Sequence, residues 1–209
     1  MQTRDHRALA VCFINSSDSS DLKRHAEAFL LGCVEPDYNP LTYLRGFIHY
    51  RAFRGHNAEN AQAHILKCLE KFQSGGPCSA FDYFTLGTLI HYVADAFTFP
   101  HNAEFQGGLR DHVIYESKLH QVFSGRLSCT ESRINAGRPN SLRLFFENAH
   151  GAYSAAPHSM ETDCDYILQT CMTVFRELLN GACEAESDCR ENGGYYENSY
   201  HHGLVSAGH

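Results

Sequence analysis

The chain has 209 residues, of which 43% are hydrophobic and 20% charged, and its formal net charge is −7. Such a length and composition are those of a globular protein with enough chain to bury one substantial core. A chain with this net negative charge provides no positive potential that would attract nucleic acid phosphates, so no nucleic acid partner is expected. The sequence also lacks an apolar run that approaches the roughly eighteen residues of a transmembrane segment.

Apolar residues recur at helical spacing along most of the chain, and the alternation typical of strands is absent. Ser79 is a good N-cap for a long apolar helix, and Pro100 should end that helix near Phe99. The stretch GCVEPDYNP, with its two prolines, is expected to be a loop. The other predicted helices cover residues 4–14, 21–31, 60–72, 110–123, 141–150 and 160–179. We therefore predict an all-α fold, a single-domain helical bundle.

The two ends of the chain carry further expectations. The first twenty residues lack the basic start and the cleavage site of a signal peptide, which favours a cytoplasmic protein, with secretion as the alternative. After Cys183 the composition turns to Gly, Asn and Tyr without apolar period, so we expect a domain over 1–183 and a flexible tail over 184–209. Nine cysteines, an odd number without a CxxC pair, fit reduced core side chains. In an exported protein, those at 164, 171, 183 and 189 could form disulfides.

The segment GTLIHYVADAFTFPH raises the question of function, because it places charged and imidazole groups along an apolar helix. His91 and Asp95 are four residues apart and share a helix face, and His101 follows just past the proline, where the chain can turn back. The later motif HVIYE places His112 and Glu116 four apart in the same way. Imidazole and carboxylate groups are common zinc ligands, and burying five of them without partners or metal would cost several kcal/mol. The pattern predicts a metal site.

Together with LGCVEPDYNPLTY and FRGHN earlier in the chain, these motifs resemble the zinc-dependent phospholipase C family of bacteria over residues 4–125. The resemblance implies a bundle of helices around a cleft that holds two or three zinc ions. It implies that Asp95 bridges two of the ions and that His101, His112 and Glu116 hold another. The implied metal ligands are His6, Asp37, His56, His91, Asp95, His101, His112 and Glu116.

The resemblance also implies roles in catalysis and substrate binding. Asp37 would lie beside the zinc-bound water and act as general base. His56 would share a zinc ion with the first histidine of HxxxD, and His49, one heptad earlier, is the alternative ligand. Tyr38 and Phe53 match aromatic residues that line a choline pocket in this family, where each ring would attract a quaternary ammonium by about 0.5–2 kcal/mol. Simple packing of the two rings is an equal alternative.

One departure from the family concerns the N-terminus. The characterised secreted members begin at a tryptophan whose amine and carbonyl bind one zinc together with a histidine. This chain begins with Met1 and Gln2 and contains no tryptophan. His6 matches the histidine, so Met1 could take the place of the tryptophan if its amine is free.

The predicted activity is zinc-dependent phosphodiester hydrolysis of the phospholipase C type. A zinc-activated water would cleave a phospholipid, or a smaller phosphodiester, to release diacylglycerol and a phosphorylated headgroup, with transient contact with a membrane surface. One alternative is a zinc nuclease on single-stranded nucleic acid, which shares the scaffold but carries HxxxD where this chain has His112 and Glu116. A second alternative is a non-catalytic, zinc-stabilised helical protein.

Overall fold

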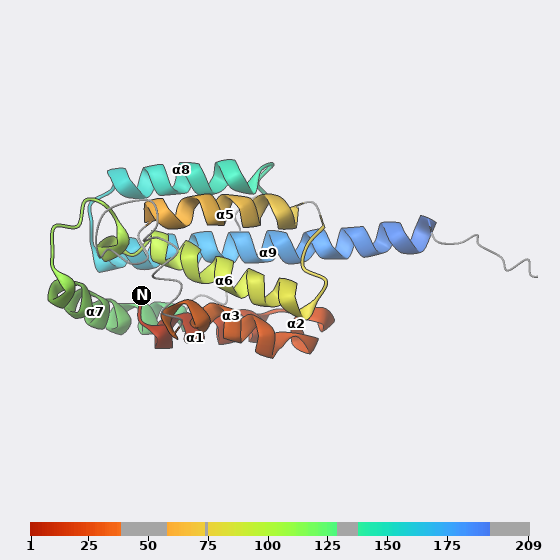
Figure 1. The fold of residues 1–209 in the computed structure, drawn as a ribbon, viewed down its shortest axis with the longest axis horizontal. Coiled ribbons are helices and arrows are strands. Elements are labelled where there is room, and N and C mark those ends of the chain that lie inside the picture. The colour runs from red at the N-terminus through yellow and green to blue at the C-terminus, as the bar shows by residue number, and fades with distance from the viewer. Residues whose placement is uncertain (39–57, 74, 129–137, 193–209) are drawn as a thin grey trace, which may run out of the picture.

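The computed structural model describes residues 1–38, 58–73, 75–128 and 138–192, and the regular elements within these ranges are all helices. This confirms the predicted all-α fold. The elements are α1 (Thr3–Ser16), α2 (Ser20–Arg24), α3 (Ala26–Tyr38), α5 (Ala58–Gln73), α6 (Ala80–Ala96), the 3-10 helix η1 (Phe99–His101), α7 (Leu109–Leu127), α8 (Leu142–Ala155) and α9 (Met160–Asn192). Figure 1 shows α5 and α8 on one side of α6 and α9, and α1, α2, α3 and α7 on the other.

Helix α6 is the centre of the bundle and packs against α3, α5 and α9. As predicted, Ser79 caps its start, because the Ser79 hydroxyl accepts a hydrogen bond from the Asp82 backbone N–H at 3.2 Å. Phe81 in its first turn is exposed, but from Tyr83 onward most of its residues are buried, which explains why the sequence shows no polar face there. The helix ends at Ala96, and Pro100 lies within η1, where the chain turns back.

Helices α3 and α6 cross at very short distance because a glycine lies on each side of the contact. A Cβ atom added to Gly32 would lie 2.0 Å from the Phe84 carbonyl oxygen, and one added to Gly87 would lie 2.2 Å from that of Phe29. Neither position therefore has room for a side chain. This close approach sets the distance between the two helices that carry Asp37 and His91.

The predicted loop over residues 32–40 is wrong for its described part, because α3 continues to Tyr38 with Pro36 inside the helix. The buried residues of α3 are Phe29, Gly32, Cys33 and Pro36, which follow the three- and four-residue spacing of a helix face. Packing of this face against α6 outweighs the hydrogen bond that the proline removes. The predicted helix over 21–31 is in turn divided at His25 into α2 and α3.

Helices α1, α5, α7 and α8 lie close to their predicted ranges, whereas α9 runs well beyond the predicted 160–179. Helix α9 extends to Asn192, beyond the expected domain boundary at Cys183, and the division into a domain and a tail stays a prediction. Cys164 and Cys171, both on α9, are buried free thiols. None of the described helices combines the length and the apolar character that crossing a membrane requires.

Candidate metal centre

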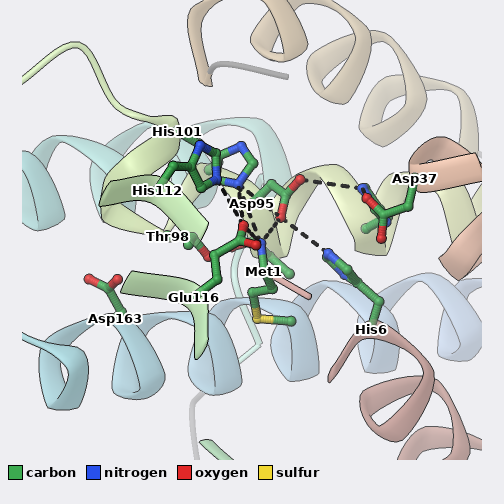
Figure 2. A network of polar contacts seen from close by, with 12 residues as sticks. Met1, His6, Asp37, Asp95, Thr98, His101, His112, Glu116 and Asp163 are labelled. Carbon is green, nitrogen blue, oxygen red and sulfur yellow. Dashed lines mark hydrogen bonds and ion pairs between the residues drawn. The ribbon is translucent and has the colours of Figure 1, made fainter. Parts of the chain in front are cut away.

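Asp95 lies at the centre of a cluster of polar side chains that come from α1, α3, α6, η1 and α7 (Figure 2). Its Oδ1 atom is 3.2 Å from His6 Nε2 and 3.7 Å from His101 Nε2, whereas its Oδ2 atom is 3.3 Å from His91 Nε2. The carboxylate is 3% exposed. Burial raises its pKa, but the surrounding nitrogen groups outweigh this effect and hold the pKa well below its usual range. Asp95 is therefore an anion whose two oxygens face different histidines.

His91 is oriented by the backbone of α3. Its Nδ1 atom donates a hydrogen bond of 2.9 Å to the Cys33 carbonyl, so that Nε2 is directed to the carboxylates of Asp95 and Asp37. A hydrogen bond at one imidazole nitrogen fixes the tautomer and leaves the other nitrogen available as a ligand. The His6 ring stacks on His91 with centroids 3.8 Å apart.

Asp37 lies on the last turn of α3, with its Oδ1 atom 3.7 Å from His91 Nε2. Its Oδ2 atom is buried and has no hydrogen-bond partner among the described residues. A buried carboxylate oxygen without a donor is costly unless a cation neutralises it. The side chain as a whole is 20% exposed, so it also borders solvent.

A second group forms where η1 meets α7. Glu116 Oε1 lies 3.2 Å from His101 Nε2 and 2.9 Å from His112 Nε2. As predicted from their spacing, His112 and Glu116 lie one turn apart on a single helix face. The His112 side chain is 28% exposed, so this group opens toward solvent. Burial raises the pKa of Glu116, but the α-amine of Met1 and the two histidines lower it by a larger amount. The pKa is therefore below its usual value, and the carboxylate is ionised.

The α-amine of Met1 lies between the two groups. It donates a hydrogen bond of 2.6 Å to Asp95 Oδ1 and is 3.1 Å from Glu116 Oε1 and 3.4 Å from His101 Nε2. Burial lowers the pKa of this amine, but the Asp95 and Glu116 carboxylates outweigh it and raise the pKa to about 10. A cation thus occupies the point where the acidic groups converge.

The donor set fits zinc. Two groups of three side chains could each hold an ion. One consists of His6, His91 and Asp95, and the other of His101, His112 and Glu116. Within each group every side chain offers one ligand atom, and the three atoms lie within 4.8 Å of one another. Nitrogen and carboxylate oxygen ligands in threes leave one tetrahedral position for water or substrate, as catalytic zinc sites require. Burial, and then the neighbouring His91, lowers the pKa of His6 to about 4, so at neutral pH its imidazole is in the form that binds metal.

The structure brings together seven of the residues that the sequence singled out: His6, Asp37, His91, Asp95, His101, His112 and Glu116. Tyr38 ends α3 with its ring 73% exposed. His56, its alternative His49, and Phe53 lie outside the described residues. Ligand and substrate roles for all of these residues stay predictions.

Sequence reasoning did not find two groups that lie beside this cluster. The Cys33 carbonyl is a backbone group, which no residue pattern reveals. Asp163 on α9 contacts the backbone of Phe99, 64 positions away in the chain, and an aspartate on an amphipathic helix gives no sign of such a partner.

The helical fold and the two adjacent groups of imidazoles and carboxylates define the class, a helical protein suited to bind zinc. The family model for zinc-dependent phospholipase C matches residues 6–162. The chain therefore belongs to the zinc-dependent phospholipase C family, which confirms the resemblance and supports a zinc hydrolase. Searches among curated proteins and among solved structures found no significant match.

Proposed function

We propose that the chain is a zinc-dependent phosphodiester hydrolase that cleaves a phospholipid into diacylglycerol and a phosphorylated headgroup. The observation that carries the proposal is the position of Asp95, which lies 3.2–3.3 Å from His6 and His91 in one group and 3.7 Å from His101 in the other. A carboxylate in this position suits a bridge between two ions. Paired ions a few ångströms apart are typical of phosphodiester hydrolysis.

The proposed ligands are those predicted from the sequence. The α-amine of Met1 is a further proposed ligand when it is unmodified and deprotonated. When bound, zinc would lower the pKa of a water molecule toward neutrality and neutralise the oxygens of the phosphodiester. His91, held by the Cys33 carbonyl, keeps its Nε2 atom directed toward Asp95. Ile90 and Ala94, the neighbours of His91 and Asp95 on α6, are buried, which limits the access of bulk water to this part of the cluster.

Asp37 is the proposed general base. Its carboxylate borders both His91 and solvent, so it can accept the proton of an attacking water that enters from the open side. The exposed ring of Tyr38 directly follows it and is available to the headgroup. We propose that a choline headgroup would contact this ring by cation–π attraction. A small soluble phosphodiester would use the same groups.

Two substitutions separate the proposed roles. Asp95→Asn is expected to lower zinc content and hydrolysis together, because one carboxylate serves more than one ion. Asp37→Asn is expected to keep most of the zinc and lose turnover. Asp165→Asn, on an exposed carboxylate of α9, is the matched control and should change neither quantity. An equal loss of zinc in the Asp37 and Asp95 variants would leave Asp37 with the role of a ligand and without that of the base.

The substrate class is tested with a chromogenic choline phosphodiester, phospholipid vesicles and single-stranded DNA, each with and without a chelator. Hydrolysis of the first two that disappears with the chelator supports the proposal. Cleavage of DNA alone would favour the nuclease alternative. Stoichiometric zinc without hydrolysis of any substrate would favour a zinc-stabilised protein that is not an enzyme.

A further inference from the structure

Asp163 is a fully buried carboxylate on α9, next to the His101–His112–Glu116 group (Figure 2). Its Oδ2 atom accepts hydrogen bonds of 3.0 Å from the Phe99 backbone N–H and 3.0 Å from the Tyr115 hydroxyl. Its Oδ1 atom accepts one of 2.8 Å from the Tyr153 hydroxyl on α8. Three donors from three different elements thus converge on one side chain.

Two of these donors belong to the segments that carry the second group. Phe99 is the first residue of η1 and lies two positions before His101. Tyr115 directly precedes Glu116 on α7. A single carboxylate oxygen therefore joins η1 to α7 at the point where His101 and Glu116 must meet. The third donor, Tyr153, lies on α8, which contributes no residue to the cluster.

A carboxylate at this position is costly for the fold. Burial raises the pKa of Asp163, and the hydrogen bonds from Phe99, Tyr153 and Tyr115 lower it by less. The ionised form therefore remains a net burden there, and an apolar side chain would often be tolerated better in such a place. What an apolar side chain cannot do is accept a hydrogen bond from η1 and another from α7 at once.

We propose that Asp163 is a positioning residue, which holds η1 against α7 and so sets the separation between the ligand atoms of His101 and Glu116. The inference rests on the proposed function, because it assigns a purpose to the geometry of one zinc-binding group. Within the part of the chain that the structure describes, the hydrogen bonds of Asp163 go to Phe99, Tyr115 and Tyr153 and to none of the proposed ligands. It acts on the two segments that carry them.

The two tyrosines provide a matched pair for the test. Tyr115→Phe removes a hydroxyl that ties Asp163 to α7, whereas Tyr153→Phe removes a hydroxyl to the same carboxylate from an element outside the cluster. Each variant keeps its ring and loses one hydrogen bond to Asp163. Thermal unfolding in excess chelator should show a comparable loss of stability in both.

Zinc affinity is measured by competition with a chromogenic chelator, on the full chain. Tyr115→Phe and Asp163→Ala should lower the affinity for one of the bound ions about 10–100-fold, as loss of a hydrogen-bond partner behind the ligands does elsewhere. The zinc affinity of Tyr153→Phe should stay within about twofold of that of the parent chain. Cobalt(II) in place of zinc gives a second readout, since its visible absorption depends on ligand geometry. That spectrum should change in Tyr115→Phe and not in Tyr153→Phe.

Equal zinc affinity in the two tyrosine variants, whether both are weakened or both unchanged, would overturn the inference and leave the proposed function intact. A parent chain that binds no zinc would overturn both. If Asp163→Ala does not fold, the tyrosine pair decides the matter alone.

Discussion

The contact between α3 and α6 predicts that Gly87→Ala will damage both the fold and the candidate metal centre. The new Cβ atom would lie 2.2 Å from the Phe29 carbonyl oxygen, whereas ordinary contact begins at 3.4 Å, so α3 must move away by about 1.2 Å. The hydrogen bond between His91 Nδ1 and the Cys33 carbonyl, now 2.9 Å long, would then exceed the length at which such bonds form.

Two magnitudes follow. Overpacking of this kind costs about 1–3 kcal/mol, of which the better helix propensity of alanine returns up to about 1 kcal/mol. In a domain of this size each kcal/mol corresponds to a fall of roughly 2–4 °C in the unfolding temperature. Loss of the bond that orients His91 should weaken zinc binding about 10–100-fold.

The assay combines thermal unfolding in chelator with a zinc competition titration. Gly151→Ala on α8 is the matched control, because a Cβ atom there meets nothing within 4 Å. That variant should be stabilised by about 0.5–1 kcal/mol and keep its zinc affinity. A Gly87→Ala chain with the stability and the zinc affinity of the parent would refute the argument that helix spacing controls the orientation of His91.

Three further predictions concern stability and metal removal. Ser79→Ala should cost about 0.5–2 kcal/mol in chemical unfolding by removing the cap of α6, without a change in zinc affinity, and an unchanged midpoint would contradict the capping role. In chelator, stability should fall as pH drops from 6.5 toward 4, because His6 is protonated more readily in the unfolded chain than in the folded one. Stability should also fall as pH rises from 8 toward 10, because the Met1 amine keeps its proton in the folded chain only up to its raised pKa. Unfolding midpoints across pH would show both slopes, to which the raised pKa of His91 adds a loss of stability above pH 6.5, and a profile without either slope would contradict the burial of these groups. Removal of zinc from the loaded chain should lower the unfolding temperature, and readdition of zinc should restore it, as calorimetry can check.

The sequence predicts the helices well where apolar spacing and a cap agree, as for α6 with Ser79. It fails over residues 32–38, because local rules treat Pro36 as a helix terminator. The buried face that includes Phe29 and Cys33 becomes recognisable only when α6 is known to lie against it. Tertiary packing decides this element, and a single sequence does not contain that information in local form.

For the candidate site, ligand pairs such as His91 with Asp95 are visible because the helix repeat itself places them together. The convergence of these pairs with His6 and Asp37 was suggested by resemblance rather than by spacing. Asp163 could not be found in advance, since its partners Phe99 and Tyr115 lie 64 and 48 positions away. Long-range hydrogen bonds to backbone groups leave no periodic trace.

The acceptor that orients His91 is a peptide carbonyl, not a side chain. No exchange of the cysteine at position 33 would by itself abolish it, since every amino acid brings the same oxygen. The direction of this imidazole is thus encoded in the course of the main chain. Relatives could vary freely in sequence at this point and still preserve the interaction, as long as their two helices remain equally near.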